Sequence, residues 1–368
     1  MERIRILVVD DVAIVRRLVV DALSVDPDLQ VVGSAGNGRE ALARIPQTRP
    51  DLVILDYEMP EMDGLETLKE IRKSHPGVKV IFFSSYTRQG AKVSLDALWQ
   101  GADDYATKVT ADNLAAATLC VQTELLPKIK ALCPRGAAPL PEIRPVVTRA
   151  AEPVGSDASA ASTAASRAAR AEIVAIGAST GGPRALSVVI EALPTDFPVP
   201  IVVVQHMPPL FTRSLAERLS TRSGFRCAEA VDGGTVEPGT VLIAPGNWHL
   251  TVVRDGHEVR TRLTADPPEN SCRPAVDPLF RSVAEAYGPG ALALLLTGMG
   301  QDGLAGARAI RERQGRVIVQ DEASSVVWGM PGAVARAGLA TRIVPLPEIA
   351  SEILKLVSPG ARRRATVA

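Results

Sequence analysis

The sequence predicts two successive α/β domains, each built on a mainly parallel sheet and joined by a tether. Apolar runs of strand length alternate with helical patterns in residues 1–130, and the same alternation resumes in residues 172–360. Between these segments, residues 131–171 contain five prolines and then a stretch composed largely of Ala and Ser. This composition cannot bury enough apolar surface to offset its ordering entropy, so it predicts a flexible linker. Residues 361–368 are expected to form a basic tail.

The composition argues against several classes of protein. The chain has 368 residues and a formal net charge of +0, which provides no overall basic field to attract nucleic acid. No apolar run approaches the roughly 18 residues that a membrane span needs, so no direct membrane insertion is expected. The four cysteines lack CxxC or metal-ligand spacing and are interpreted as reduced packing residues of a cytoplasmic protein.

The first domain is expected to hold five strand–helix units. The strands are predicted at residues 4–9, 30–35, 52–55, 78–83 and 105–108, and the helices at 14–22, 40–45, 65–71, 93–99 and 114–129. Five units of this kind predict a doubly wound, flavodoxin-like domain with a five-stranded parallel sheet.

Polar side chains end four of these strands. Asp10 and Asp11 follow the first strand, Asp56 ends the third, Ser84 the fourth and Lys108 the fifth. Because parallel strands share one carboxyl edge, these groups are expected to converge there. Three carboxylates suit Mg²⁺, and Asp56 could then attack phosphorus while Lys108 neutralises the transferred group. Taken singly, Asp11 could be only a helix N-cap, Ser84 a plain strand-end hydroxyl and Lys108 a solvated charge.

The motifs around these residues resemble the receiver domain of response regulators. They are Val8–Asp11, the run Leu-Asp-Tyr-Glu-Met-Pro-Glu-Met-Asp-Gly at 55–64, and Ser84-Ser85. The resemblance covers the whole first domain and implies that a histidine kinase phosphorylates Asp56, with Mg²⁺ as the cofactor. It implies metal ligands and supporting residues as follows: Asp10, Asp11 and Asp56 hold the metal, Lys108 supports the phosphoryl group, and Ser84 and Tyr105 are switch positions.

One position departs from this family. Receiver domains usually have Lys-Pro with a cis bond, whereas this chain has Lys108-Val109. A non-proline cis bond costs about 2.5–4 kcal/mol, so a trans bond or a local rearrangement is expected here.

The second domain repeats the alternation of strands and helices. Strands are predicted at residues 172–177, 199–205, 240–244, 291–297, 316–320 and 339–344, and helices at 182–192, 210–221, 276–287, 303–313 and 347–357. Residues 250–263 alternate around Asp255-Gly256, which indicates an antiparallel hairpin. We therefore expect a second doubly wound α/β domain with a mainly parallel sheet and one hairpin.

A glycine-rich turn, Ile-Gly-Ala-Ser-Thr-Gly-Gly at 176–182, follows the first strand of this domain and precedes its first helix. A strand, a tight turn and a helix around G-x-S-x-G indicate that Ser179 is an exposed nucleophile. The alternative is a phosphate- or dinucleotide-binding turn. That alternative is weaker, because the spacing is not GxGxxG, no Walker lysine follows and no acidic residue ends the next strand.

Two further polar residues are expected at the same sheet edge, namely His206 and Asp302. A serine hydroxyl needs an adjacent base, which a histidine supplies when a carboxylate fixes its tautomer. We therefore expect Ser179, His206 and Asp302 to form one site. Considered alone, His206 could be a packing residue and Asp302 the N-cap of its own helix. His249 and His257 are competing candidates for the base.

The second domain resembles the catalytic domain of the chemotaxis protein-glutamate methylesterases. The motifs that carry this resemblance are Gly177–Gly182, Gln205–Met207, Ala244–Leu250, Arg273–Asp277 and Thr297–Gly303. It implies Ser179 as nucleophile, His206 as base, Asp302 as orienting carboxylate and the N–H of Met299 as an oxyanion-hole donor. The turn geometry adds the N–H of Thr180 as a second donor, with the Thr180 hydroxyl within reach of His206.

The family's order of receiver, linker and esterase fits the whole chain. It implies phosphorylation-activated hydrolysis of γ-glutamyl methyl esters on methyl-accepting chemoreceptors, with methanol as product, and deamidation of receptor glutamines. The expected partners are these chemoreceptors and a chemotaxis histidine kinase, and no cofactor is expected in the esterase site. The unphosphorylated first domain is expected to lie over the active-site edge. The alternative function is a response regulator whose esterase-like domain binds or sequesters a partner without catalysis.

Overall fold

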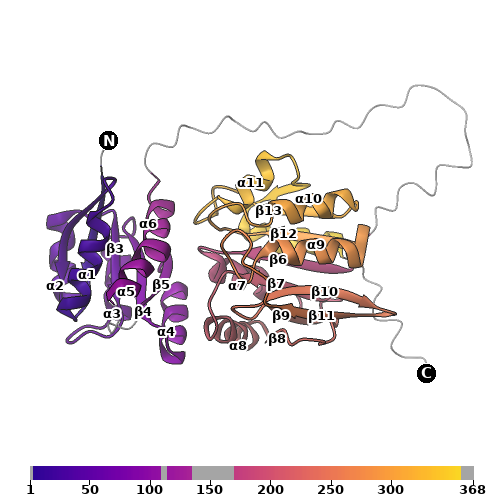
Figure 1. Cartoon of the computed structure of the whole chain (residues 1–368), viewed down its shortest axis with the longest axis horizontal. Helices are drawn as coiled ribbons and strands as arrows, with labels where there is room; N and C mark the ends of the chain where they lie inside the picture. The colour runs from indigo at the N-terminus through magenta and orange to yellow at the C-terminus, as the bar shows by residue number, and fades with distance from the viewer. Residues whose placement is uncertain (1–2, 109–113, 135–169, 358–368) are drawn as a thin grey trace, which may run out of the picture.

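A computed structural model of the chain describes residues 3–108, 114–134 and 170–357, which form an N-terminal and a C-terminal α/β domain (Figure 1). The predicted linker is covered only at its two ends, and the predicted basic tail and the Lys108-Val109 peptide bond lie outside the described residues. Among the described residues, no helix combines the length and the apolar character that crossing a bilayer requires.

The N-terminal domain has the five strands that the sequence predicts, paired in parallel in the order β2-β1-β3-β4-β5. The strands are β1 (Ile4–Val9), β2 (Leu29–Ala35), β3 (Leu52–Asp56), β4 (Lys79–Ser85) and β5 (Asp104–Lys108). The helices are α1 (Ala13–Ser24), α2 (Gly38–Thr48), α3 (Gly64–Ser74), α4 (Arg88–Trp99), α5 (Leu114–Cys120), the π-helical turn η1 (Val121–Leu125) and α6 (Leu126–Leu132). The strand order changes direction between β1 and β3, where a doubly wound sheet opens a crevice.

The C-terminal domain has a seven-stranded, entirely parallel sheet in the order β14-β13-β12-β6-β7-β9-β8. Its strands are β6 (Ile173–Ala178), β7 (Ile201–Gln205), β8 (Arg226–Glu229), β9 (Thr240–Ile243), β12 (Ala291–Leu295), β13 (Arg316–Gln320) and β14 (Arg342–Val344). The predicted hairpin is present as β10 (His249–Asp255) and β11 (Glu258–Thr264), but it forms a sheet of its own. The doubly wound fold class predicted for both domains is confirmed.

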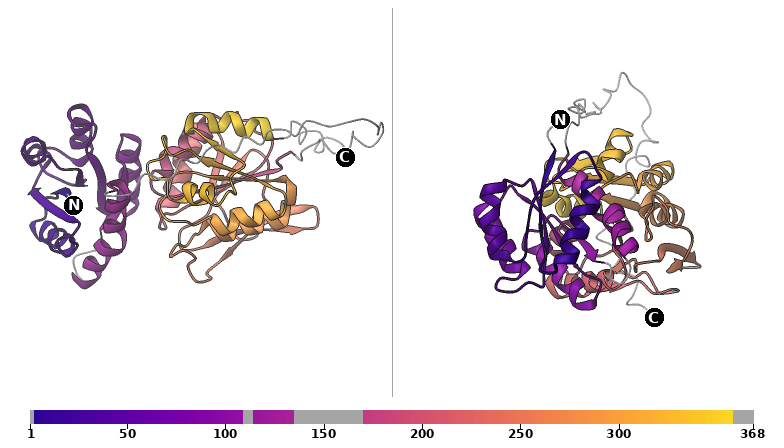
Figure 2. Two further views of the ribbon diagram at one scale, coloured as in Figure 1. Left: turned by 90° about the horizontal axis from the view of Figure 1, so that it is seen from above. Right: turned by 60° about the vertical axis from the view of Figure 1, so that its left-hand side comes forward.

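Helices cover both faces of the C-terminal sheet, as the view from above shows (Figure 2). They are α7 (Gly182–Glu191), α8 (Phe211–Ser223), α9 (Val276–Tyr287), α10 (Leu304–Glu312), α11 (Met330–Arg336) and α12 (Ile349–Leu356), with short 3-10 turns η2 (Gly288–Gly290) and η3 (Leu346–Glu348). Neither β8 nor α11 was predicted from the sequence. The central strands β6, β7 and β12 are buried along their whole length, as expected for a sheet covered on both faces.

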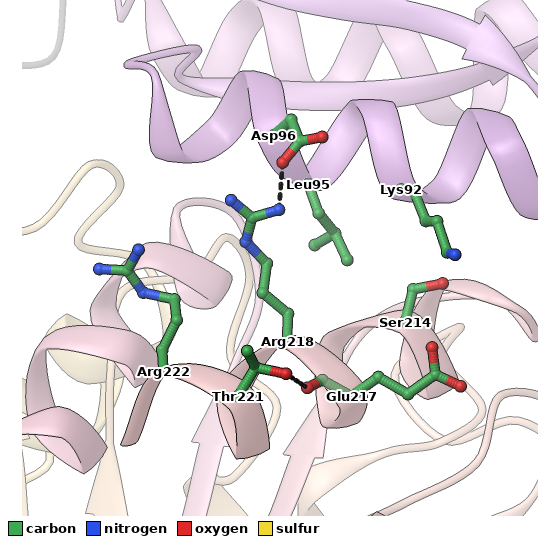
Figure 3. A pocket seen from close by; sticks show the side chains of 8 residues that line it. All are labelled: Lys92, Leu95, Asp96, Ser214, Glu217, Arg218, Thr221 and Arg222. Atoms are coloured by element: carbon green, nitrogen blue, oxygen red, sulfur yellow. Dashed lines mark hydrogen bonds and ion pairs between the residues drawn. The ribbon is translucent and has the colours of Figure 1, made fainter. Parts of the chain in front are cut away.

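The two domains contact each other through α4 of the first and α7 and α8 of the second. The ring of Tyr105, on β5, stacks on Phe211 at the start of α8, with centroids 4.8 Å apart. Further along α8, the guanidinium of Arg218 pairs with Asp96 of α4 (Figure 3). The same guanidinium lies over the ring of Trp99. The contact therefore joins the carboxyl side of the C-terminal sheet to the α4–β5 face of the N-terminal domain.

Candidate functional site

The turn between β6 and α7 holds Ser179 at the carboxyl edge of the C-terminal sheet. Gly181 begins α7 with φ +75°, in the left-handed region that glycine adopts without strain. On the far side of the turn, a Cβ on Gly298 would lie 2.8 Å from Cβ of Ser179, so only glycine permits this approach. The local sequence therefore places a half-buried serine where two backbone segments come close together.

His206 lies beside Ser179 because β6 and β7 are neighbours in register. Ala178 pairs with Gln205, and the N–H of His206 donates to the Ala178 carbonyl at 3.1 Å. The Gln205 side chain reinforces this alignment, since its Nε2 donates to the Ser179 carbonyl at 2.9 Å. Ser179 and His206 thus each come directly after one member of the Ala178–Gln205 pair, which places them side by side.

Asp302 completes the arrangement from the loop after β12. Its Oδ2 lies 2.7 Å from Nε2 of His206. The same carboxylate accepts the N–H of Val276 at 2.7 Å and that of Asp277 at 3.1 Å. These are the first two residues of α9, so the positive end of that helix stabilises the negative charge. Asp302 is therefore not the N-cap of α10, a position that Gly303 occupies. Its carboxylate instead accepts N–H groups at the start of α9.

His206 and Asp302 each favour the charged form of the other. Burial would raise the pKa of Asp302, but the hydrogen bond and charge of His206 and the α9 N–H groups hold it below its ordinary value. Burial would lower the pKa of His206, but the hydrogen bonds to Asp302 and to the sulfur of Cys272 raise it above its ordinary value. The carboxylate therefore stabilises the imidazolium form, as a base that takes up a proton requires.

The hydroxyl of Ser179 makes no hydrogen bond within the described part of the chain. Nδ1 of His206, the nitrogen left available by the contact with Asp302, faces Sγ of Cys272 at 3.5 Å. Cys272, which the sequence indicated only as a packing residue, thus lies at the site. Its position just before the Arg-Pro-Ala-Val-Asp motif was the available signal.

The two expected oxyanion donors have free N–H groups. Within the residues that the structure covers, neither the N–H of Thr180 nor that of Met299 donates to a protein acceptor. The Thr180 hydroxyl donates its hydrogen bond to Oδ2 of Asp104, in the N-terminal domain, at 3.0 Å and not to His206. Both side chains of that bond are buried. A residue of the first domain therefore reaches the position directly after Ser179.

The competing histidines lie elsewhere. His249 is buried, and its Nδ1 accepts the N–H of Ala275 while Nε2 faces the carbonyl of Pro267 at 3.1 Å. Both ring nitrogens are therefore occupied by backbone groups, which assigns His249 a structural role. His257 is exposed at the tip of the β10–β11 hairpin.

The N-terminal domain gathers the three expected carboxylates at its own crevice. Ligand oxygens of Asp10, Asp11 and Asp56 lie within 4.8 Å of one another. Nζ of Lys108 lies 2.6 Å from Asp10 and 2.7 Å from Asp56. Burial, against the opposing charge of Lys108, raises the pKa of Asp56 to about 6. Two buried acids, one exposed acid and a single ammonium leave an excess of negative charge, which fits a divalent cation.

The other positions expected at this edge differ in their contacts. Asp11 is exposed and does not cap α1, because Val12 occupies the N-cap position. The N–H of Val12 donates to Oδ1 of Asp10 at 2.9 Å. The Ser84 hydroxyl bonds to Ser94 of α4 and does not contact the carboxylates. Tyr105 is buried at the domain contact, where it stacks on Phe211.

Comparison with known proteins identifies both domains. The sequence profile of the CheB methylesterase family matches residues 174–353, and that of the response regulator receiver domain matches residues 6–118. A protein-glutamate methylesterase/protein-glutamine glutaminase of Nocardioides sp. is 50% identical over 365 residues, covering 96% of each chain. A protein of the same name from Trichodesmium erythraeum is 49% identical, covering 97% of this chain and 100% of that one.

A solved structure agrees with these relatives. The catalytic domain of Thermotoga maritima CheB methylesterase is 45% identical, with a TM-score of 0.50. The match covers 51% of this chain and 100% of that one, so it accounts for the C-terminal domain.

The contact between Cys272 and His206 leads to a testable prediction. In Cys272→Ala the pKa of His206 should fall, because an interaction that stabilises the imidazolium is lost. The measurement is an NMR titration of the ring, which is practicable because the chain has only 4 histidines. Cys227→Ala, a buried cysteine of β8, is the control and should leave the His206 titration unchanged. An unchanged or higher pKa in Cys272→Ala would contradict the prediction.

Proposed function

The chain belongs to the CheB methylesterase family and carries a response regulator receiver domain ahead of the catalytic domain, and we infer that it is a phosphorylation-regulated protein-glutamate methylesterase and protein-glutamine glutaminase. We assign the receiver to residues 1–130 and the esterase to residues 172–360. The substrates are γ-glutamyl methyl esters and glutamines of methyl-accepting chemoreceptors, and the phosphodonor is a chemotaxis histidine kinase. Cys120, Cys227 and Cys272 are free thiols, which supports a cytoplasmic site of action.

The hydrogen-bonded pair of His206 and Asp302 is the observation that carries the proposed chemistry. Ser179 attacks the ester carbonyl while Nδ1 of His206 takes its proton, since Nε2 is committed to Asp302. The imidazolium then returns the proton to the leaving methanol, or to ammonia when the substrate is a glutamine. Water, activated by the same nitrogen, hydrolyses the acyl-enzyme and regenerates Ser179.

The developing oxyanion needs donors that are already in place. The N–H groups of Thr180 and Met299 belong to the two turns that meet at Gly298, and neither donates to another group among the described residues. These properties support the assignment of both N–H groups to the oxyanion hole. Loss of a single donor of this kind costs about 2.7–4 kcal/mol of transition-state stabilisation in subtilisin.

The receiver site supports phosphorylation of Asp56. Mg²⁺, held by Asp10, Asp11 and Asp56, would supply positive charge against the phosphoryl oxygens. The chain's own contributions are the nucleophilic carboxylate of Asp56 and the ammonium of Lys108, which lies 2.7 Å from it. Phosphorylation of Asp56 would add negative charge next to the ammonium of Lys108, so the contacts of Lys108 are the first to change.

The docked receiver provides the regulation. Asp104 of β5 accepts the hydroxyl of Thr180, directly after the nucleophile, and Tyr105 stacks on Phe211. We infer that this contact keeps a receptor helix away from Ser179. The same strand carries Lys108 at its other end, so β5 links the phosphorylation site to the contact. Between α4 and α8 the contact is loose, since a groove of about 380 Å³ remains beside the Asp96–Arg218 pair (Figure 3).

The first test of this function is the change Ser179→Ala. Methanol release from methylated chemoreceptor should fall by several orders of magnitude, because the reaction loses its nucleophile; the corresponding change in subtilisin costs on the order of 10⁶ in kcat. Ser351→Ala, an exposed serine of α12, is the control and should keep wild-type activity. Near-wild-type release from Ser179→Ala, or failure of a fluorophosphonate probe to label the wild-type chain, would favour the alternative of a non-catalytic binding domain.

The second test concerns the contact between the domains. Asp104→Ala should raise the methanol release of the unphosphorylated chain about 2- to 10-fold, because docking loses a buried hydrogen bond of about 0.5–1.5 kcal/mol. The fully phosphorylated activity, obtained with acetyl phosphate and Mg²⁺, should change little. Asp21→Ala, which removes an exposed carboxylate on α1, is the control. If Asp104→Ala had the basal rate of the wild type, direct occlusion through this contact would be wrong.

A further inference from the structure

A four-residue turn, Glu269–Cys272, lies against the hydrogen-bonded pair of His206 and Asp302. The N–H and carbonyl of Glu269 and Cys272 bond to each other in both directions, at 3.1 and 2.8 Å. The two central residues have positive φ, +50° at Asn270 and +62° at Ser271, as a type I′ turn requires. Neither of them is glycine, although asparagine adopts this region more readily than most residues. The chain thus places a non-glycine side chain at a position where glycine would be less strained.

The side chain of Asn270 contacts the carboxylate that orients the base. Its Nδ2 donates to Oδ1 of Asp302 at 3.0 Å and to Oδ2 of Asp277 at 2.9 Å. One amide group has two N–H bonds to give, and here each goes to a different buried acid. On Asp302 the opposite oxygen, Oδ2, receives His206. The two oxygens of this carboxylate are therefore held from opposite sides.

The electrostatics explain why a neutral double donor is needed. Asp277 and Asp302 are both buried, and burial together with the charge of Asp302 raises the pKa of Asp277 above its ordinary value. Asp277 also accepts the N–H of Gly306 at 2.6 Å, which anchors it between α9 and α10. The charge of Arg281 acts against this rise, but its guanidinium is paired with Glu269 at the start of the turn. Without the amide of Asn270, the two acids would face each other with no side-chain donor between them.

We propose that Asn270 is a positioning residue for the reaction, which fixes the rotamer of Asp302 and, through it, the tautomer and ring orientation of His206. This inference rests on the proposed function, because it assigns His206 as the base. The adjoining end of the turn supports it, since Cys272 places its sulfur 3.5 Å from Nδ1 of the same ring. One short turn therefore contacts both members of the acid–base pair.

The test compares two substitutions in the full chain, assayed for methanol release from methylated chemoreceptor with acetyl phosphate and Mg²⁺. Asn270→Gly removes the amide and relaxes the backbone, so kcat should fall about 10- to 100-fold with little change in KM, as for partners that orient a ligating group. Asn270→Asp keeps the shape but adds a carboxylate. It should lower kcat and move the acidic limb of the kcat/KM profile to higher pH, because the added charge stabilises the His206 imidazolium.

The titratable groups around the pair, Cys272, Asp277 and Arg281, are unchanged in both variants, so the shift of the profile reports the new charge. Gln314→Gly is the matched control: Gln314 is exposed, has φ +64° and lies in the turn before β13, at the opposite edge of the sheet. It should have wild-type kcat.

The outcomes separate this proposal from the function on which it rests. A wild-type chain that releases no methanol contradicts the proposed function. An active wild type with Asn270→Gly within twofold of its kcat overturns the positioning role. If circular dichroism shows that Asn270→Gly does not fold, the test rests on Asn270→Asp alone. A raised KM with an unchanged pH profile in Asn270→Asp would indicate a purely structural role and overturn the proposal.

Discussion

The proposed esterase site depends on the parallel register of three neighbouring strands, β6, β7 and β12. The carboxyl ends of these strands lie at one edge of the sheet. Ser179, His206 and the loop that carries Asp302 therefore lie close together although they are far apart in sequence. A slip of one residue between β6 and β7 would turn the side chains of β7 to the opposite face and move His206 away from Ser179. The buried apolar residues of these strands therefore maintain the geometry of the site as well as the stability of the fold.

The receiver domain also collects its polar residues at the carboxyl edge of a parallel sheet. Strand β5 connects this proposed phosphorylation site to the proposed esterase site. Lys108 at one end of this strand contacts Asp56, and Asp104 at the other end contacts Thr180. This five-residue edge strand pairs with β4 on one side, and side chains of η1 and α6 bond to its backbone on the other: Thr107 donates its N–H to Glu124, and Lys128 donates to the carbonyl of Tyr105. The polar residues that define each site thus lie on elements that the hydrophobic core already fixes.

The sequence was sufficient to predict the fold class and the strand-end residues, because apolar periodicity determines both. Ser179, His206 and Asp302 each lie beyond a recognisable strand, and their convergence follows from parallel pairing. Asp104, Asn270 and Cys272 were not predicted as site residues, and the reason is physical. Their roles depend on contacts between the domains or within an irregular turn. The hydrophobic periodicity of the sequence gives no information about such contacts. The short edge strand β8 and helix α11 escaped prediction because neither carries a long enough apolar pattern.

The strength of the contact between the domains is consistent with a switch. Its contacts include the buried hydrogen bond of Asp104, the stack on Phe211 and the partly exposed ion pair of Arg218, each contributing at most about 1–1.5 kcal/mol. Two further hydrogen bonds cross the contact: the hydroxyl of Tyr86 donates to the carbonyl of Pro209, and Nε1 of Trp99 donates to Oγ of Ser187. Buried apolar residues of both domains also belong to one cluster, which includes Leu95, Tyr105 and Phe211, so the docked form is favoured in the resting protein. A phosphoryl group acts only through contacts that differ between the two forms. In the proposed mechanism, phosphorylation at Asp56 shifts this balance by a coupling free energy of about 1–3 kcal/mol, acting through Lys108 and β5, and releases Thr180 and Ser179 together.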